Sequence, residues 1–165
     1  MEFKNYFALA HNSRGALRSP PHITLHMPFS WADRKTTKLI GTLENLAAGL
    51  KPFEIQLKGF GCFEPRVIFI RIEPAADLNL MHKKTEYAFK TELNLFNAVY
   101  RNEAFMPHLT IAFRDLKKEA FNKAWQEFEH KPFEAVWKID NICLLKHDGQ
   151  KWEPFKWFPC TALTV

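Results

Sequence analysis

A five-residue pattern of proline, histidine, an aliphatic residue, threonine and a second aliphatic residue occurs twice in this chain. The first copy is PHITL at 21–25, and the second is PHLTI at 107–111. In a β-strand, the side chains at positions i and i+2 point to the same face of the sheet. Each copy would therefore present a histidine and a threonine on one face and aliphatic side chains on the other. The pattern restricts the fold to one with two short strands that each have a polar and an apolar face.

The sequence around the two copies predicts alternating helices and strands. Apolar residues recur at helical spacing in some segments and alternate with polar residues in others. The predicted helices are a short one that starts near residue 2 and those at 31–50, 76–98 and 116–129. The predicted strands are 22–27, 53–57, 67–72, 107–113, 133–139 and a last one that carries Trp152 and Trp157. Ser30 and Asp33 resemble a capping box for the helix at 31–50, and Asp115 is expected to cap the helix at 116–129.

This order of elements predicts a single α+β domain over residues 1–165. A shift of 86 residues superposes the two histidines and the two threonines, and the order of helices and strands around them also matches. We therefore expect two related halves, at about 1–63 and 64–165, that arose by duplication.

Composition limits the class of protein. Hydrophobic residues make up 47% of the chain and aromatic residues 15%, which supplies a packed core and excludes a disordered chain. No apolar segment has the length of a signal peptide or a membrane span, so we expect no membrane association. Three cysteines without CxxC spacing argue against a disulfide framework and against a zinc site, and they favour a reducing, cytoplasmic location. The net charge of +5 favours anionic partners, although a solvated surface explains the dispersed lysines and arginines equally well.

The residue types in the repeated pattern suit chemistry at a phosphate. The unperturbed pKa of histidine, about 6.5, allows one histidine to take a proton from water and another to protonate a leaving oxygen. The candidate catalytic pair is His22 and His108. The hydroxyl groups of Thr24 and Thr110 can donate hydrogen bonds to phosphate oxygens. This arrangement requires neither a metal nor a cofactor. A single copy could arise by chance among seven histidines, but two copies in strand context, each after a proline, favour a functional role.

The two motifs resemble the paired HxTx motifs of the 2H phosphoesterase superfamily, which includes 2'-5' RNA ligase-like proteins and cyclic nucleotide phosphodiesterases. The resemblance extends from about residue 2 to residue 147. It implies a bilobal fold in which two pseudo-symmetric halves with antiparallel sheets surround a central cleft, with helices outside. It also implies that His22 and His108 are the acid–base pair and that Thr24 and Thr110 bind phosphate.

The reaction implied by the resemblance is the opening of a 2',3'-cyclic phosphate to a 2'-phosphate by water. The expected substrate is an RNA with a cyclic phosphate end or a small cyclic nucleotide. A module that binds RNA or nucleotides without turnover is the first alternative, and 2'-5' joining of RNA ends is the second. We expect a monomer, with a dimer as the alternative. Family members usually begin with a strand before the first helix. Here the first half opens on the helix, so either the chain starts inside the usual start or the strand is lost.

Further residues are candidates for weaker roles. Arg114 lies six residues after His108 and, by strand period, on the same face, where it could contact a phosphate or could simply be exposed. Phe29 and the Phe60–Phe63 stretch could stack on a base, although core packing suits them better. His26 is expected at the rim of the site or in solvent, and Gly59 is expected to form a bulge at a strand end. The other histidines are expected at the surface or in capping positions: His11, His82, His130 and His147.

Overall fold

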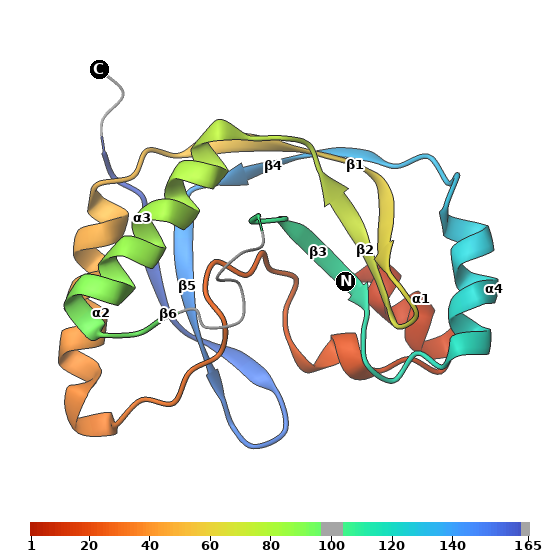
Figure 1. The fold of residues 1–165 in the computed structure, drawn as a ribbon, viewed down its shortest axis with the longest axis horizontal. Helices are drawn as coiled ribbons and strands as arrows, with labels where there is room; N and C mark the ends of the chain where they lie inside the picture. The colour runs from red at the N-terminus through yellow and green to blue at the C-terminus, as the bar shows by residue number, and fades with distance from the viewer. Residues whose placement is uncertain (97–103, 163–165) are drawn as a thin grey trace.

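The computed structural model describes residues 1–96 and 104–162 of the chain (Figure 1). The helices are α1 (Glu2–Ala10), α2 (Thr36–Ala48), α3 (Ala76–Leu93) and α4 (Lys118–Phe128), with short 3-10 helices η1 (Gly15–Arg18) and η2 (Asp33–Lys35). The strands are β1 (Phe53–Phe63), β2 (Val67–Ile72), β3 (His108–Ala112), β4 (Glu134–Ile139), β5 (Asn141–His147) and β6 (Trp152–Pro159). The chain is therefore an α+β protein, as predicted. None of the helices within the described ranges is both long and apolar enough to cross a membrane.

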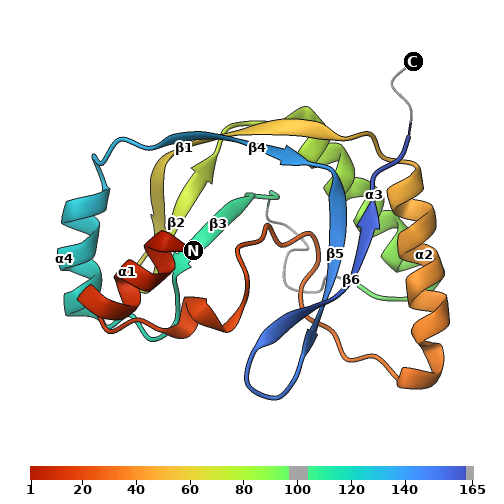
Figure 2. The ribbon, with the colours of Figure 1, turned by 180° about the vertical axis from the view of Figure 1, so that it is seen from behind.

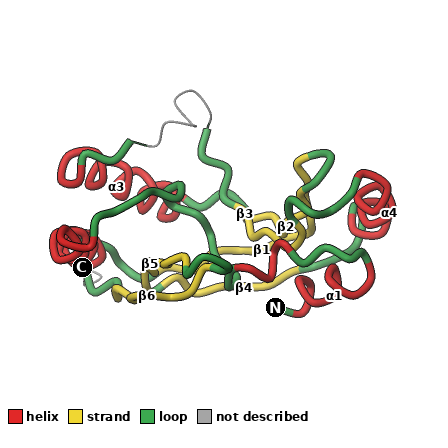
Figure 3. Tube along the Cα trace, turned by 90° about the horizontal axis from the view of Figure 1, so that it is seen from below, coloured by secondary structure: helices red, strands yellow, loops and turns green. Residues whose placement is uncertain are grey.

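The strands form two antiparallel sheets. The larger sheet is curled and has the order β3-β2-β1-β4, and β5 pairs with β6 in a second, two-stranded sheet. Helices α1 and α4 lie at one end of the molecule and α2 and α3 at the other, with β1 and β4 running between them (Figures 1 and 2). The view from below shows the same separation of the helices (Figure 3). The long strand β1, paired with β4, thus connects the two helical ends.

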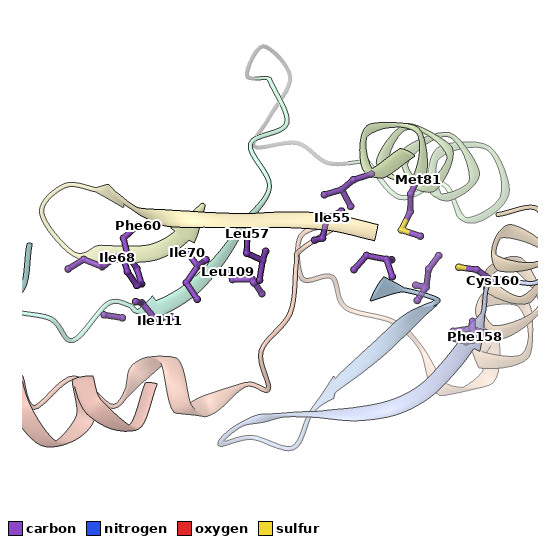
Figure 4. Close-up of a cluster of buried hydrophobic side chains, with 14 of the residues drawn as sticks. Ile55, Leu57, Phe60, Ile68, Ile70, Met81, Leu109, Ile111, Phe158 and Cys160 are labelled. Atoms are coloured by element: carbon purple, nitrogen blue, oxygen red, sulfur yellow. The ribbon is translucent and has the colours of Figure 1, made fainter. Parts of the chain in front are cut away.

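Buried side chains line the middle of β1, at Ile55, Leu57 and Phe60 (Figure 4). At one end, the ring of Phe128 on α4 lies 4.8 Å from that of Phe60 on β1 and 5.0 Å from that of Phe7 on α1. At the other end, α2 packs against α3, β5 and β6. The buried residues there include Leu39, Leu43, Met81 and Phe158. Each fully buried side chain of this size contributes roughly 1.5–3 kcal/mol, so both ends of the strand are firmly held.

A bulge in β1 changes which residues of that strand face the core. Ile55 and Leu57 are buried before it, whereas Phe60 is buried after it, so the inward positions pass from odd to even numbers. The register with β2 shifts between Leu57 and Phe60, and Gly59 there has a φ of +61°, which glycine adopts without strain. The predicted bulge is confirmed, but the strand continues to Phe63 rather than ending at Gly59. As a result, Phe63 points away from the core.

The carboxylate of Asp115 ties the start of the chain to the end of β3. It accepts hydrogen bonds from the Ser13 hydroxyl (2.8 Å) and from the backbone N–H groups of Arg14 (2.7 Å) and Gly15 (2.8 Å). A Cβ on residue 15 would collide with the carbonyl oxygen of Phe113, so the close approach requires glycine. The prediction that Asp115 caps the next helix is wrong: α4 begins at Lys118 after Lys117 and has no side-chain cap.

Several predicted boundaries differ from the structure. The predicted strand 22–27 is an irregular segment, because it is not hydrogen-bonded to a neighbouring strand and alternation alone does not supply a partner. The capping box of Ser30 and Asp33 does not form: η2 precedes α2, and neither helix has a side-chain cap at its start. The helix predicted at 76–98 ends at Leu93 because Asn94 adopts a left-handed conformation with a φ of +55°. Residues 97 and 98 of that prediction lie outside the described residues.

Candidate functional site

The two histidines of the repeated motif have the same local hydrogen bond. Nδ1 of His22 lies 2.8 Å from the carbonyl oxygen of Pro20, and Nδ1 of His108 lies 2.8 Å from that of Met106. A carbonyl oxygen only accepts hydrogen bonds, so Nδ1 carries the proton in each ring. The lone pair of each neutral imidazole is therefore on Nε2, which is the atom left for a substrate. In both motifs the acceptor is two residues before the histidine, and a proline separates them.

The two histidines lie close enough to influence each other's charge. Burial lowers the pKa of His22 below its usual value, and the positive charges of Lys4 and His108 lower it further, against the hydrogen bond to Pro20, which raises it. This coupling follows from the fold, because α1 and η1, which precede His22 in the chain, both pack against β3. The segment that carries His22 passes between β3 and the β5–β6 hairpin in two opposite views (Figures 1 and 2).

The threonines of the motifs are placed differently. Thr110 lies on β3, where Leu109 and Ile111 are buried and His108 and Thr110 are partly exposed on the other face. Thr24 is exposed in the irregular segment. Within residues 1–96 and 104–162, neither threonine hydroxyl makes a hydrogen bond to the protein, so both are available to a ligand. The alternation predicted from the sequence is confirmed for the second motif. The first motif is not part of a sheet, so the predicted alternation of its side chains between two sheet faces does not apply.

An aromatic wall, which we define as Phe63 and Phe69, lies beside His108. The ring of His108 is 5.1 Å from that of Phe63 and 5.0 Å from that of Phe69. A Cβ at Gly61 would lie 2.5 Å from the ring of Phe69, so the absence of a side chain there makes room for this ring. Arg71 pairs directly with His108 across β2 and β3 and is exposed. The sequence analysis missed Phe69 and Arg71, although both occupy the face of β2 opposite the buried Ile68 and Ile70.

A buried lysine lies behind His22. Lys4 is 4% exposed, and its ammonium group donates hydrogen bonds to the carbonyl oxygens of Ser19 (2.9 Å) and Pro20 (3.3 Å). Burial lowers the pKa of Lys4 to about 8. The oxygen of Pro20 thus accepts from both Lys4 and His22. The sequence analysis also missed Lys4, although its spacing of three residues from the buried Phe7 places it on the inward face of α1.

Comparison with known proteins identifies the family. Residues 2–151 match the 2'-5' RNA ligase superfamily. The chain belongs to this superfamily, the 2H phosphoesterases. Proteins of Bacillus thuringiensis (strain Al Hakam), Bacillus cereus (strain Q1) and Bacillus anthracis (strain A0248), each named "Putative phosphoesterase", are 32% identical to it over 94 residues. The match covers 56% of this chain and 51% of theirs, so it spans about half the length of these relatives.

A solved structure has the same fold. The crystal structure of TT0787 of Thermus thermophilus superposes with a TM-score of 0.63 over 97% of this chain and 92% of that chain, at 19% identity. This likeness shows the fold, and the family match over residues 2–151 confirms the resemblance to the 2H phosphoesterases that the two HxTx motifs indicated.

Two further candidate residues lie outside the histidine pair. Arg114 follows the end of β3, has a φ of +63°, and places its guanidinium 4.9 Å from the ring centre of Phe113. The prediction that it shares the strand face of His108 is wrong, because the strand ends at Ala112. Phe29 is partly buried and packs against an aromatic cluster of His26, Trp31 and Phe89, in agreement with the core packing that we favoured.

The remaining histidines of the chain divide into two groups. His130 and His147 are exposed, as predicted, and His147 accepts a hydrogen bond from the backbone N–H of Gly149. The other three histidines are partly covered by aromatic rings, so they are not free surface residues. His11 is nonetheless the C-cap residue of α1, in agreement with the predicted capping alternative. His26 packs on Phe89, His82 stacks on Phe105, and His11 packs on Phe7. In the described part of the chain, no three His, Cys, Asp or Glu side chains are grouped as metal ligands would be.

Proposed function

We propose that this protein is a metal-independent phosphoesterase that hydrolyses a 2',3'-cyclic phosphate, of RNA or of a nucleotide, to a 2'-phosphate. The observation that carries the proposal is the histidine pair. Both rings are protonated on Nδ1, both leave Nε2 for the substrate, and the charge of His108 reaches His22. Membership of the 2'-5' RNA ligase superfamily and the names of the Bacillus relatives support phosphoester chemistry.

The reaction needs one histidine as base and one as acid. Nε2 of the base takes a proton from water as the water oxygen forms a bond to phosphorus. The bond between phosphorus and O3' breaks, and Nε2–H of the acid protonates O3'. The product carries a 2'-phosphate and a free 3'-hydroxyl, and exchange with solvent restores both histidines. Such acid–base assistance contributes roughly 10² to 10⁴-fold to the rate.

The neighbouring polar groups support the same chemistry. The hydroxyls of Thr110 and Thr24 can donate to the non-bridging phosphate oxygens, and the guanidinium of Arg71 supplies a positive charge beside His108. We also propose that the chain consists of two lobes that arose by duplication. This duplication is supported by the two motifs, since each has a proline before the histidine and the same Nδ1 hydrogen bond.

Removal of each histidine tests the proposal. We expect His22→Ala and His108→Ala each to lower the hydrolysis of a 2',3'-cyclic nucleotide by at least about 100-fold while circular dichroism remains unchanged. His130→Ala is the matched control, because that side chain is 89% exposed. Incubation with EDTA should leave the activity of the wild-type protein unchanged. Full activity in either histidine variant of the pair would refute the acid–base assignment.

The substrate screen should run from mononucleotides to short RNA, with the position of the product phosphate read by NMR. Salt-dependent RNA binding without any product would refute the proposal and favour the alternative, a module that binds RNA without turnover. A product with a 2'-5' linkage would replace it by end joining.

A further inference from the structure

The two histidine motifs differ at the acceptor of the Nδ1 hydrogen bond. The carbonyl oxygen of Pro20 accepts from His22 and also from the ammonium group of Lys4. The carbonyl oxygen of Met106 accepts from His108, and within the described residues it has no second side-chain donor. The two Nδ1 hydrogen bonds, which have the same length and the same spacing in sequence, therefore differ by one buried cation.

The surroundings of Lys4 make this cation unusual. Its side chain is 4% exposed, and among the described residues its ammonium group has no carboxylate partner, only the carbonyl oxygens of Ser19 and Pro20. Burying a charge without an opposite charge is costly, and this cost is visible in the pKa of Lys4, which burial lowers to about 8. At neutral pH the group still carries its charge for most of the time. Anchoring two carbonyl oxygens could be done by a neutral donor, so the charge itself calls for an explanation.

The charge acts on His22 in two ways. A carbonyl oxygen that already accepts from an ammonium group is a weaker acceptor for an imidazolium N–H, and the ammonium also repels a positive charge on the ring. The charged groups that act on His22 are Lys4 from α1 and His108 from β3, and both disfavour the protonated ring. Neutral His22 keeps its proton on Nδ1 and its lone pair on Nε2.

We propose that Lys4 is a positioning residue that makes the two histidines unequal: it holds His22 as the neutral ring that accepts a proton from water, and it leaves His108 as the donor to the leaving oxygen. The assignment of base and acid rests on the proposed function. The effect of Lys4 on His22 does not, because it can be measured without a substrate.

The direct test is an NMR titration of the full chain labelled with 15N-histidine. In Lys4→Met, we expect the midpoint of His22 to move upward from its wild-type value, and by more than the midpoint of His108. Lys4→Arg keeps the charge and should keep the midpoint of His22 low. The matched control is Lys123→Met, which removes a charge from the exposed face of α4, where Lys123 has no ion pair to any described residue. An unchanged or lowered midpoint of His22 in Lys4→Met would overturn the proposal.

A measurement on the wild-type protein covers the case in which Lys4→Met does not fold. The Cε resonance of Lys4, assigned by its absence from Lys4→Arg, should titrate near pH 8, and the ring nitrogens of His22 should respond over the same range. Titration of Lys4 near its ordinary value of 10.5, with no response at His22, would overturn the proposal.

The pH profile of activity tests the role of His22 as base. The value of kcat/KM falls at low pH as the base becomes protonated, which gives its pH profile an acidic limb. A higher pKa of His22 in Lys4→Met should move this limb to higher pH. Lys4→Arg should restore the limb, and Lys123→Met should not move it. A limb that stays in place while the NMR midpoint of His22 moves would overturn His22 as base. If the wild-type protein hydrolyses no cyclic phosphate, the proposed function fails, and the NMR comparison still decides the effect of Lys4.

Discussion

The hydrogen bonds of Asp115 connect the two segments that carry the histidines, and their removal has a predictable cost. Ser13, Arg14 and Gly15 precede His22, and Asp115 follows the strand of His108. Asp115→Ala removes the acceptor of three hydrogen bonds, which are worth roughly 0.5–1.5 kcal/mol each in net terms. The carboxylate is exposed, so solvent can replace part of this energy. However, Ser13 is 0% exposed, and its hydroxyl would lose its partner.

Full addition at the upper value would give about 4.5 kcal/mol. Because the three bonds share one carboxylate and do not add fully, we predict that Asp115→Ala lowers the free energy of unfolding by about 3 kcal/mol. Asp115→Asn should cost about 1 kcal/mol, because the amide oxygen can still accept from the backbone and its NH2 can donate to Ser13. Asp33→Ala is the matched control: its carboxylate is 97% exposed, and its loss should change stability by less than about 0.5 kcal/mol.

The assay is urea unfolding followed by circular dichroism, with the midpoint compared at constant m-value. A loss of about 3 kcal/mol also corresponds to a fall in Tm of roughly 6–12 °C for a chain of this size. A cost below about 1 kcal/mol for Asp115→Ala, or an Asn variant that is less stable than the Ala variant, would show that this contact does not hold the two segments together.

Two further predictions concern the surroundings of His108. Arg71→Gln should raise KM about three- to tenfold with a much smaller change in kcat, and this increase in KM should shrink in high salt. Arg66→Gln, at the exposed β1–β2 turn, is the control, and an equal effect of both variants would argue against a contact between Arg71 and the substrate. Gly61→Ala should lower the free energy of unfolding by about 1–3 kcal/mol, because a Cβ there would lie 2.5 Å from the ring of Phe69. In the control Gly41→Ala, the added Cβ meets no atom within 4 Å, so thermal unfolding should show unchanged or higher stability.

The sequence predicts most of the regular elements because their patterns depend on local residues. The β-branched run of β2 and the alternation in β4 are recognisable without tertiary information, and the second histidine motif lies on β3 as expected. The first motif has the same residue pattern but no strand, because pairing depends on a neighbour that alternation does not specify. Asp115 failed as a predicted cap for a related reason. Its carboxylate suits a helix start and a distant loop equally well, and the fold brings Ser13 to it.

The sequence predicts the central histidines of the candidate site but not the residues that surround them. The histidines belong to a repeated motif, which a single sequence reveals. Lys4, Phe63 and Arg71 have no motif, and each enters the site through a long-range feature of the fold. Phe63 is the clearest case, because unbroken alternation from Ile55 and Leu57 would direct it into the core. Only the bulge at Gly59 turns it to the side of His108.

The irregular first motif and the regular second motif suggest different ways of holding the same ring. His108 is fixed by the pairing of β3 with β2 and by the aromatic wall beside it. His22 lacks a strand partner, so its orientation depends on the Pro20 carbonyl, and the position of that carbonyl depends on Lys4. A single buried ammonium group thus replaces part of what a sheet does for the other histidine. Because the ammonium group is charged, it also disfavours the protonated form of His22. The same contact that orients the ring therefore also biases its protonation, which links the loss of regular structure in the first motif to the inequality of the two histidines.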